Sequence, residues 1–467
     1  MDSDKPIPLF GTGQTGESLT PIAQTHVNIY AEESDEKGLA FYGTPGTTLR
    51  VSFGDTPVRG WIAVGDLFYV VHRGMFYSVN NAGTKTAIGS ALSTVEGRVD
   101  MAYDGAVILI TTGTNGYTYT IASNTLAEVT DGDFPDAANT CAWLDGQFIV
   151  DDGVSDTFYI SPNGTAWDAL DFATAESNPD GLERVFVDNG EVVLGGTGTI
   201  EFWGSIGTGD FPFAAIKGAT AEFGLAARWS LCKFNSGLAG LMKRPQGQVQ
   251  VMFISGYVPR PISSPEVDSI INAYATVSDA TFYAWMNGGH PMLRCNFPSV
   301  EKSWDYDALT NMWAPAQYGL SGARARGEMH LDYLNKQIVA DYSNGDIYNL
   351  DATVYDDNGV SIAREIVSRH IFDADNRVTI DQLYVDMEVG VGLATGQGSD
   401  PQIMLQVSKD NGKTWGAERW ADLGKIGKYQ TRVVWRRLGR ARDWTFKIRM
   451  SDPVKFVLTF AAAKLRP

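Results

Sequence analysis

The segment that decides the fold is Tyr342-Ser343-Asn344-Gly345-Asp346-Ile347-Tyr348-Asn349-Leu350-Asp351. Asn-Gly is a preferred pair at a β-hairpin turn, and the apolar and aromatic residues after it favour a strand. Similar units, each a short apolar strand, a turn rich in Gly, Asn or Asp, and a strand carrying an aromatic residue, begin at Asp66, Asp104, Asp145, Asn189, Asn235, Asp279 and Tyr333. A hairpin that recurs about every 40 residues predicts a β-propeller of about seven blades over residues 45–362.

After residue 362 the pattern changes. Apolar residues occupy every second position in 383–389 and again in 444–450. A period of two places one face of a strand in a core and the other in water. Several such strands separated by turns indicate a β-sandwich. The expected chain is therefore all-β, with an N-terminal arm (1–44), a β-propeller (45–362) and a C-terminal β-sandwich-like domain with basic strands (363–467).

The arm contains Gly11-Thr12-Gly13-Gln14-Thr15-Gly16, which has the spacing of a dinucleotide-binding loop. That loop must open a helix, whereas Pro21 follows here and no helical period is present. A flexible arm is the expected structure, and no cofactor is expected.

Charge is divided unevenly along the chain. The net charge is −18, yet residues 424–467 hold 12 basic and 2 acidic residues, which leaves 25 basic and 53 acidic residues in the rest. An acidic body of net −28 is repelled by nucleic acid and by anionic membrane surfaces. The start of the chain has no apolar run typical of a secretion signal, and no stretch has the length of a membrane span.

No catalytic or metal-binding pattern stands out. The three cysteines are too far apart for a metal knuckle, and an odd number gives no disulfide framework. The five histidines also stand apart, without the close His/Glu spacing of a metalloprotease. We therefore expect a protein that is not an enzyme and that holds neither a metal nor a cofactor.

A single full Asp-box motif lies in the C-terminal part. Its residues are Ser408, Asp410, Gly412, Thr414 and Trp415. The motif is known from sialidases and other propellers, where its role is structural. Asp410 is expected to cap the turn, Gly412 to take a positive φ, and Trp415 to pack beneath the hairpin. A degenerate copy runs from Ser161 to Trp167.

The basic end is the most informative charge feature. We expect its cations to form an assembly interface for an acidic partner, on strands that place Arg432 and Arg436 on one face and Arg437 with Trp435 on the other. Wet faces of sandwich strands and contact with DNA are the alternatives. The candidate interface residues are Lys425, Lys428, Arg432, Arg436, Arg437, Arg440 and Arg442.

Three blocks resemble the packaged-DNA-stabilisation, or tail-hub, family of short-tailed bacteriophages. One is Ala175-Glu176-Ser177-Asn178-Pro179-Asp180-Gly181 with the later Gly198-Thr199-Ile200-Glu201-Phe202-Trp203. The second is Arg432-Val433-Val434-Trp435-Arg436-Arg437-Leu438-Gly439-Arg440, and the third runs from Phe446 to Pro453. Their order and the total length also match the family, as does the segment from Val27 to Gly46.

This resemblance implies a structural virion protein without catalysis. It would form a ring, expected to be a hexamer, below an upstream portal-adaptor ring, with a distal tail needle or nozzle and a nearby tailspike or fibre. Such a hub would close the portal channel and retain packaged DNA, which would pass through without sequence-specific binding. The implied location is the virion tail, assembled in the host bacterial cytoplasm, with no membrane partner.

Two alternative hypotheses of function remain. One is a sialidase-like propeller that degrades a surface glycan, for which the Asp-box is the only support. The other is a monomeric carbohydrate-binding propeller. Ring formation would separate the hub from both.

Overall fold

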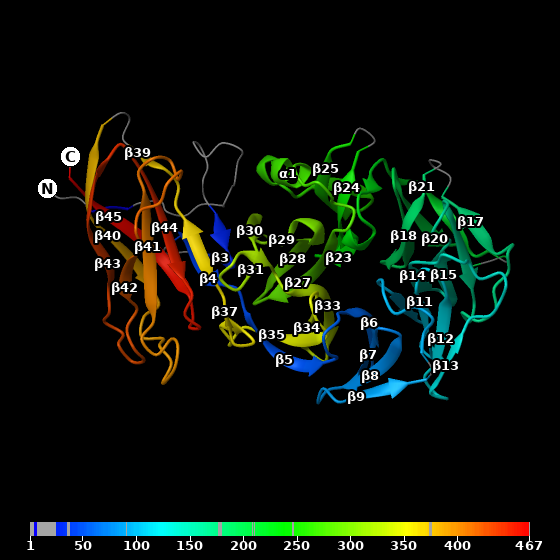
Figure 1. The fold of residues 1–467 in the computed structure, drawn as a ribbon. Helices are drawn as coiled ribbons and strands as arrows, with labels where there is room; N and C mark the ends of the chain where they lie inside the picture. The colour runs from blue at the N-terminus through cyan, green and yellow to red at the C-terminus, as the bar shows by residue number, and fades with distance from the viewer. Residues whose placement is uncertain are drawn as a thin grey trace.

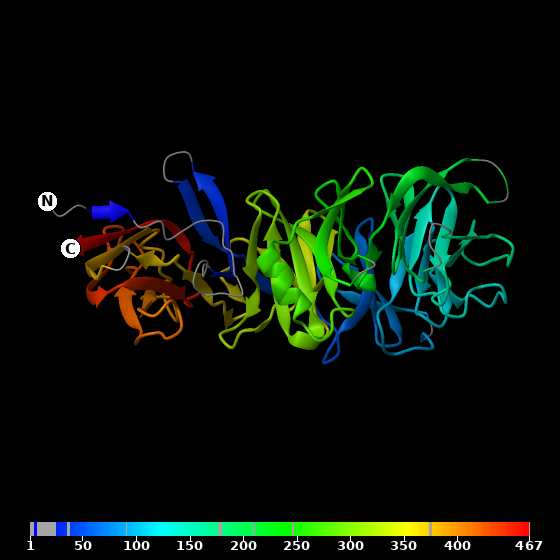
Figure 2. The same cartoon turned by 90° about the horizontal axis from the view of Figure 1, so that it is seen from above.

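The computed structural model describes residues 4–6, 25–34, 38–89, 91–175, 180–207, 209, 211–244, 247–372 and 376–466. The molecule is elongated, with a propeller at one end and a sandwich at the other (Figure 1). Both termini lie at the sandwich end, so the chain leaves the sandwich, builds the propeller and returns (Figures 1 and 2). The glycine-rich segment 11–16 lies outside the described residues.

Seven sheets of the described propeller follow one another in sequence, and we number them blades 1 to 7. Blade 1 consists of β6 (Val58–Val64), β7 (Leu67–His72), β8 (Met75–Asn80) and β9 (Lys85–Ile88), and blade 2 of β10 (Asp100–Tyr103), β11 (Val107–Thr111), β12 (Gly116–Thr120) and β13 (Thr125–Glu128). Blade 3 consists of β14 (Cys141–Leu144), β15 (Gln147–Asp151), β16 (Thr157–Ser161) and β17 (Phe172–Thr174). Blade 4 consists of β18 (Leu182–Asp188), β19 (Glu191–Gly196), β20 (Ile200–Ser205) and β21 (Phe213–Ala221).

Blades 5 to 7 are less regular. Blade 5 consists of β22 (Gly224–Leu225), β23 (Cys232–Phe234), β24 (Gly237–Lys243), β25 (Val249–Ser255) and β26 (Val258–Pro261). Blade 6 consists of β27 (Thr281–Asn287), β28 (His290–Phe297), β29 (Lys302–Asp307) and β30 (Met312–Pro315). Blade 7 consists of β33 (Gly327–Tyr333), β34 (Lys336–Asp341), β35 (Asp346–Asp351), β5 (Gly46–Ser52), β36 (Asp356–Asp357) and β37 (Val360–Ser361). A two-stranded sheet, β31 (Gln317–Tyr318) with β32 (Ala323–Arg324), joins blades 6 and 7.

The innermost strands close into a ring. β6 contacts β10, β10 contacts β14, and β14 contacts β18. The short 3₁₀ turn η1 (Arg228–Ser230) contacts both β18 and β27, and β23 also contacts β27. β27 contacts β33, and β33 returns to β6. The ring is closed by β5, which comes from the start of the chain and pairs antiparallel with β35 from its end.

Apolar side chains fill the spaces between neighbouring blades. Tyr69 of blade 1 packs on Tyr119 of blade 2, and Phe158 of blade 3 meets Trp203 of blade 4 edge to face. Each blade thus buries both faces, which explains why its central strands read as short continuous apolar runs. The one α-helix of the described residues, α1 (Pro265–Asn272), is capped by Ser264. No helix in the described segments is both long and apolar enough to span a bilayer.

The sandwich has two six-stranded sheets. The first contains β3 (Ile29–Ser34), β4 (Gly38–Gly43), β45 (Val457–Arg466), β40 (Val378–Met387) and β43 (Val433–Ala441), with β1 (Asp4–Pro6) on β45. The second contains β2 (His26–Val27), β38 (Arg364–Val367), β44 (Asp443–Met450), β41 (Gln402–Ser408) and β42 (Arg419–Asp422), with β39 (Ile371–Phe372) on β44. The alternation seen in the sequence holds, because Leu383, Val385 and Met387 all face the core.

The expectation of a separate N-terminal arm is wrong for its described residues. β2 pairs with β38, and β4 pairs with β45, so this segment supplies strands to both sheets of the sandwich. Ile29, Ala31 and Phe41 are fully or almost fully buried in the sandwich core. Their alternation is the same period-two signal, but the hairpin stands more than 300 residues before the strands that it joins.

Asn28 fixes the sandwich to the propeller. Its amide nitrogen donates to the Gln317 and Ala363 carbonyl oxygens, both at 2.9 Å. Its side-chain oxygen accepts from the Gln317 N–H at 2.8 Å. One side chain from the start of the chain therefore ties the segment after blade 6 to the entry of the sandwich.

Candidate functional site

The Asp-box forms the hairpin turn that the sequence predicts. The Ser408 hydroxyl donates to Asp410 Oδ1 at 2.7 Å, and Gly412 takes a φ of +77°. The Thr414 N–H and hydroxyl both donate to the Asp410 carboxylate. The pKa of Asp410 falls to about 2, first because of the Thr414 hydroxyl and then through its backbone N–H. The motif thus caps a turn and offers no reactive group.

The packing role expected for Trp415 stays a prediction: its ring lies 4.0 Å from the position of a Cβ built on Gly412, at the hairpin turn. Trp415 is only half-buried, and Lys447 Nζ lies 4.3 Å from the centre of its ring. The degenerate copy has the buried tryptophan instead: Trp167 is 6% exposed, and its Nε1–H donates to the Gly164 carbonyl oxygen at 3.0 Å. Phe134, in the linker between blades 2 and 3, lies edge to face against Trp167.

The basic residues predicted as an interface lie together on the sandwich. Lys425, Lys428 and Arg432 stand in the segment between β42 and β43. The other four arginines lie on β43 and in the turn after it. Lys425 is 3.5 Å from the Asp400 carboxylate, and the Arg440 Nε–H donates to the Arg377 carbonyl oxygen at 3.4 Å. All seven side chains are exposed: Lys425, Lys428, Arg432, Arg436, Arg437, Arg440 and Arg442.

The expected division of these arginines between two faces is wrong. Arg437 has a φ of +58°, and the pairing of β43 with β40 shifts register on either side of it. This bulge turns Arg436 and Arg437 to the same exposed face. Trp435 points the other way, is 4% exposed, and donates its Nε1–H to the Arg419 carbonyl oxygen at 2.9 Å. Trp435 therefore belongs to the core and does not stack on a guanidinium of this set.

Apolar side chains accompany the cations. Trp420, Ile426 and Tyr429 are 55%, 64% and 74% exposed. Trp420 lies on β42, and the other two stand in the turn that carries Lys425 and Lys428. Exposed tryptophan and tyrosine among arginines is a composition typical of the energetic centre of protein interfaces. We call Trp420, Lys425, Ile426, Lys428, Tyr429, Arg432 and Arg436 the sandwich tip.

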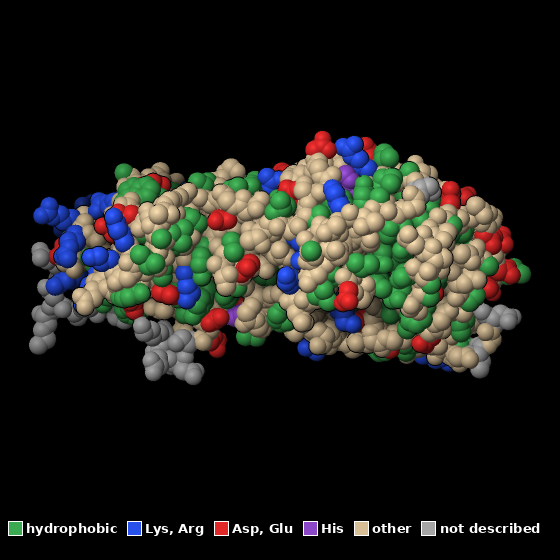
Figure 3. Space-filling view, turned by 90° about the horizontal axis from the view of Figure 1, so that it is seen from below, with side chains coloured by type: hydrophobic (Ala, Val, Ile, Leu, Met, Phe, Trp, Pro, Cys, Tyr) green, Lys and Arg blue, Asp and Glu red, His purple; other side chains and the backbone are tan. Residues whose placement is uncertain are grey.

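The two ends of the molecule carry opposite charge. Figure 3 shows Lys and Arg gathered at the sandwich end and Asp and Glu at the far end, over blades 3 and 4. Blade 3 and its linkers expose Asp133, Asp136 and Asp168 together with Val154 and Leu170. Each end therefore combines charge of one sign with exposed apolar groups.

The centre of the propeller holds a polar set that the sequence did not predict. Arg98, Asp100 and Arg184 line the channel enclosed by the innermost strands. The guanidinium carbons of Arg98 and Arg184 lie 4.4 and 5.1 Å from the ring centre of Trp229. Burial raises the pKa of Asp100, while the two arginines oppose that shift. Ring closure brings these residues together from three blades, so no local pattern signals them.

The described residues show no assembled catalytic centre. Nowhere in the described chain do three metal-ligating His, Cys, Asp or Glu side chains gather. His290 Nδ1 lies 2.9 Å from Asp307, and His370 Nδ1 lies 3.0 Å from Asp443, in separate domains. The three cysteines are free thiols, and burial raises the pKa of each. Neither pair stands beside one of these thiols in a nucleophile–base arrangement within the described region.

Comparison with known proteins identifies both domains. Residues 5–355 match the family model described as "Bacteriophage P22 Gp10, beta-propeller". Residues 363–466 match the model "Bacteriophage P22 Gp10, beta-sandwich". The two models confirm the predicted fold class, a propeller followed by a sandwich.

A curated relative is the "Tail hub protein gp10" of Salmonella phage P22. It is 24% identical over 303 residues, which cover 62% of this chain and 61% of the relative. Solved propellers are also similar, including virginiamycin B lyase from Staphylococcus aureus (12% identity, 63% of this chain and 95% of that one, TM-score 0.44). Another is the WD40 propeller domain of Doa1 (13% identity, 66% and 96%, TM-score 0.39). The chain belongs to the bacteriophage P22 Gp10 family of short-tailed phage tail hubs.

Proposed function

We propose that this chain is a non-enzymatic structural protein of a phage tail hub, located in the virion tail and assembled in the host bacterial cytoplasm. Family membership and the similarity to a tail hub protein support this role. Copies of the chain form a ring, expected to be a hexamer. The ring closes the portal channel, retains packaged DNA, and joins the upstream adaptor ring to a distal needle or nozzle, with a tailspike or fibre nearby.

The separation of charge is the observation that carries the assembly role. The sandwich tip is basic and carries exposed aromatic residues, and the rest of the chain has a net charge of −28 over residues 1–423. Complementary charge on two parts of one chain favours head-to-tail contacts, which close into a ring when the rotation between copies allows it. An acidic body of this size also disfavours tight contact with DNA, in agreement with a genome that passes without sequence-specific binding.

Reversal of two exposed arginines tests this role. Arg436→Glu with Arg440→Glu should leave the protomer folded, since exposed charges contribute little to stability. It should reduce the ring fraction in sedimentation velocity, most strongly at low salt, where attraction between surfaces is least screened. Particles made with this variant should package DNA and then leak it.

A matched control carries the same change of charge elsewhere. Lys217 and Lys336 are exposed on the propeller, so Lys217→Glu with Lys336→Glu should assemble as the unmodified chain does. Equal loss of rings in both variants would attribute the effect to net charge alone. Normal rings for the arginine variant, with weaker DNA binding only, would assign the basic strands to DNA instead.

A further inference from the structure

A cavity of about 760 Å³ opens at one end of the propeller channel. It lies where the innermost strands of blades 1, 6 and 7 begin, at Val58, Thr281 and Glu328, and Trp229 of η1 reaches it from blade 5. Apolar groups cover much of the wall, and four arginines stand among them. The cationic lining residues are Arg59, Arg73, Arg98 and Arg324.

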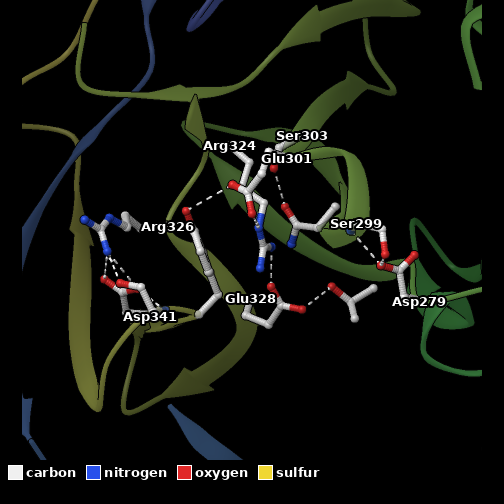
Figure 4. A network of polar contacts seen from close by, with 12 residues as sticks. Asp279, Ser299, Glu301, Ser303, Arg324, Arg326, Glu328 and Asp341 are labelled. Atoms are coloured by element: carbon white, nitrogen blue, oxygen red, sulfur yellow. Dashed lines mark hydrogen bonds and ion pairs between the residues drawn. The ribbon is translucent and has the colours of Figure 1, made fainter. Parts of the chain in front are cut away.

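Three of these arginines are already neutralised or hydrogen-bonded. The Arg59 guanidinium donates to the Gly97, Arg73 and Thr94 carbonyl oxygens. Arg73 pairs with Asp55 at 2.9 Å. Arg324 is 5% exposed, and its guanidinium stacks on the Tyr342 ring. It also pairs with Glu328 at 2.5 Å, an ion pair that is drawn in Figure 4. The Thr281 hydroxyl in turn donates to Glu328 at 2.8 Å, so this network holds the wall of the cavity in place.

Arg98 differs from the other three. Among the described residues it has no hydrogen-bond or ion-pair partner, and its Nη1 is covered without an acceptor. Its guanidinium stacks on the Trp229 ring. A second guanidinium, that of Arg184, lies 5.1 Å from the centre of the same ring. Burial and then the nearby Arg184 lower the pKa of Arg98 to about 10, while Glu328 and Asp100 oppose the shift, so the group remains charged at neutral pH. A charged guanidinium without an acceptor is costly in such a place, and a bound anion removes that cost.

We propose that this cavity is a docking site for an acidic peptide segment of another protein, with a carboxylate of the peptide placed against Arg98. The cavity is large enough for several side chains and offers them apolar walls at Val58, Val95 and Met329. A carboxylate forms paired hydrogen bonds with a planar guanidinium. The arrangement places a cation without a hydrogen-bond acceptor in the lining of a partly apolar pocket.

Other ligands fit less well. Glu96 and Glu328 line the same cavity. Their negative charges repel the several phosphates of a nucleic acid or polyphosphate more strongly than they repel the single charge of one carboxylate. A sugar ring usually stacks on an exposed indole, and one face of Trp229 already carries the Arg98 guanidinium. The sequence alone gives no cluster of arginines, since Arg59 and Arg73 come from blade 1, Arg98 from the linker between blades 1 and 2, and Arg324 from β32 between blades 6 and 7.

A labelled glutamate tetrapeptide tests the proposal with the full chain. Fluorescence anisotropy at low salt should show binding of this probe and none of a tetraglutamine probe. Arg98→Gln should weaken binding by roughly tenfold or more, the loss expected for a charge-assisted hydrogen bond. Glu96→Gln should tighten binding, because it removes a like charge from the wall. Lys217→Gln, which removes an exposed cation from β21 of blade 4 outside the cavity lining, should leave binding unchanged.

The opposite results overturn the proposal. Tetraglutamine binding as tightly as tetraglutamate would exclude a carboxylate site, and so would equal affinity in Arg98→Gln. A labelled oligonucleotide or a sialic acid glycoside that binds more tightly than the peptide would assign the cavity to another ligand class. If Arg98→Gln does not fold, Glu96→Gln decides alone, and failure to tighten binding rules the site out.

Discussion

Val51 on β5 pairs with Ile347 on β35, so the first strand of the propeller completes the sheet built by its last hairpin. Arg50, the residue before Val51, sits at a register shift in this pair and places its guanidinium 5.0 Å from the ring centre of Tyr333. Its Nη2 donates to the Asn81 carbonyl oxygen of blade 1 at 2.9 Å. The closing strand therefore binds blade 7 through its backbone and blade 1 through a side chain.

Closure predicts unequal costs for two substitutions at this sheet. Ile347 is fully buried between blades 7 and 1, so Ile347→Ala should lower the free energy of unfolding by about 2–5 kcal/mol. Leu49 on the partner strand is 47% exposed, and Leu49→Ala should change it by less than about 0.5 kcal/mol. Chemical denaturation measures both. Equal costs would mean that Ile347 is not part of a packed core between blades 7 and 1.

The two Asp-box tryptophans should also differ. Trp167→Ala should destabilise the chain by about 3–5 kcal/mol through the cavity that it leaves beside Phe134. Trp415→Ala removes a half-buried ring and its contact with Lys447, worth about 0.5–1 kcal/mol at an exposed site. Thermal melting of both variants checks the order. A larger loss for Trp415→Ala would support the packing role predicted for it from the full motif.

The hairpin turns were predictable because their signals are local. Asn344-Gly345 does lie in the turn between β34 and β35, but neither residue has a positive φ. Asn344 instead accepts from the Asp346 N–H at 2.9 Å, and a Cβ on Gly345 would meet the Cβ of Phe53 at 2.8 Å. The glycine is thus required by the approach of the closing strand, a contact that no window of sequence around the turn contains.

Some of the site residues could likewise be predicted from the sequence, and others could not. The basic segment was visible because its cations are contiguous, yet the faces of Arg436 and Arg437 were not, since a bulge breaks the period of two. Arg98 and Trp229 could not be paired from sequence, because only ring closure brings their blades together. Trp435 was misjudged for a related reason: its hydrogen bond to Arg419 crosses between two sheets.

Asp151 gives the chain a pH dependence of definite sign. It is fully buried on blade 3, and burial raises its pKa to about 6 despite hydrogen bonds from Thr140 and Asn139. A carboxyl with a raised folded pKa binds more protons folded than unfolded, so its contribution to stability is present at pH 4 and is lost as pH rises to about 6. The expected loss is about 3 kcal/mol.

Asp151→Asn should remove that part of the pH dependence. Unfolding by denaturant at pH 4.5 and pH 6.5 should show a smaller drop for the variant than for the unmodified chain. Asp145→Asn provides the control, because Asp145 is exposed on the same blade and the change in net charge is the same. Parallel pH profiles for the unmodified chain and Asp151→Asn would show that this carboxyl is not the source.

The last prediction concerns the apolar part of the sandwich tip. If this surface joins copies into a ring, its energy should come mainly from buried aromatic groups, with the cations steering the approach and setting the salt dependence. Tyr429→Ser with Trp420→Ser removes two rings that are 74% and 55% exposed, so the protomer should fold normally. The ring fraction in sedimentation velocity should fall at both low and high salt.

That independence from salt separates the aromatic variant from the arginine reversal, whose effect should fade as salt screens the charges. Leu309→Ser is the matched control, since Leu309 is 63% exposed on blade 6, away from the tip. Aromatic substitution is expected to act on the rate of dissociation, and charge reversal on the rate of association. Rings of normal amount and lifetime after loss of both aromatic residues would show that the tip faces water or another protein in the assembled hub.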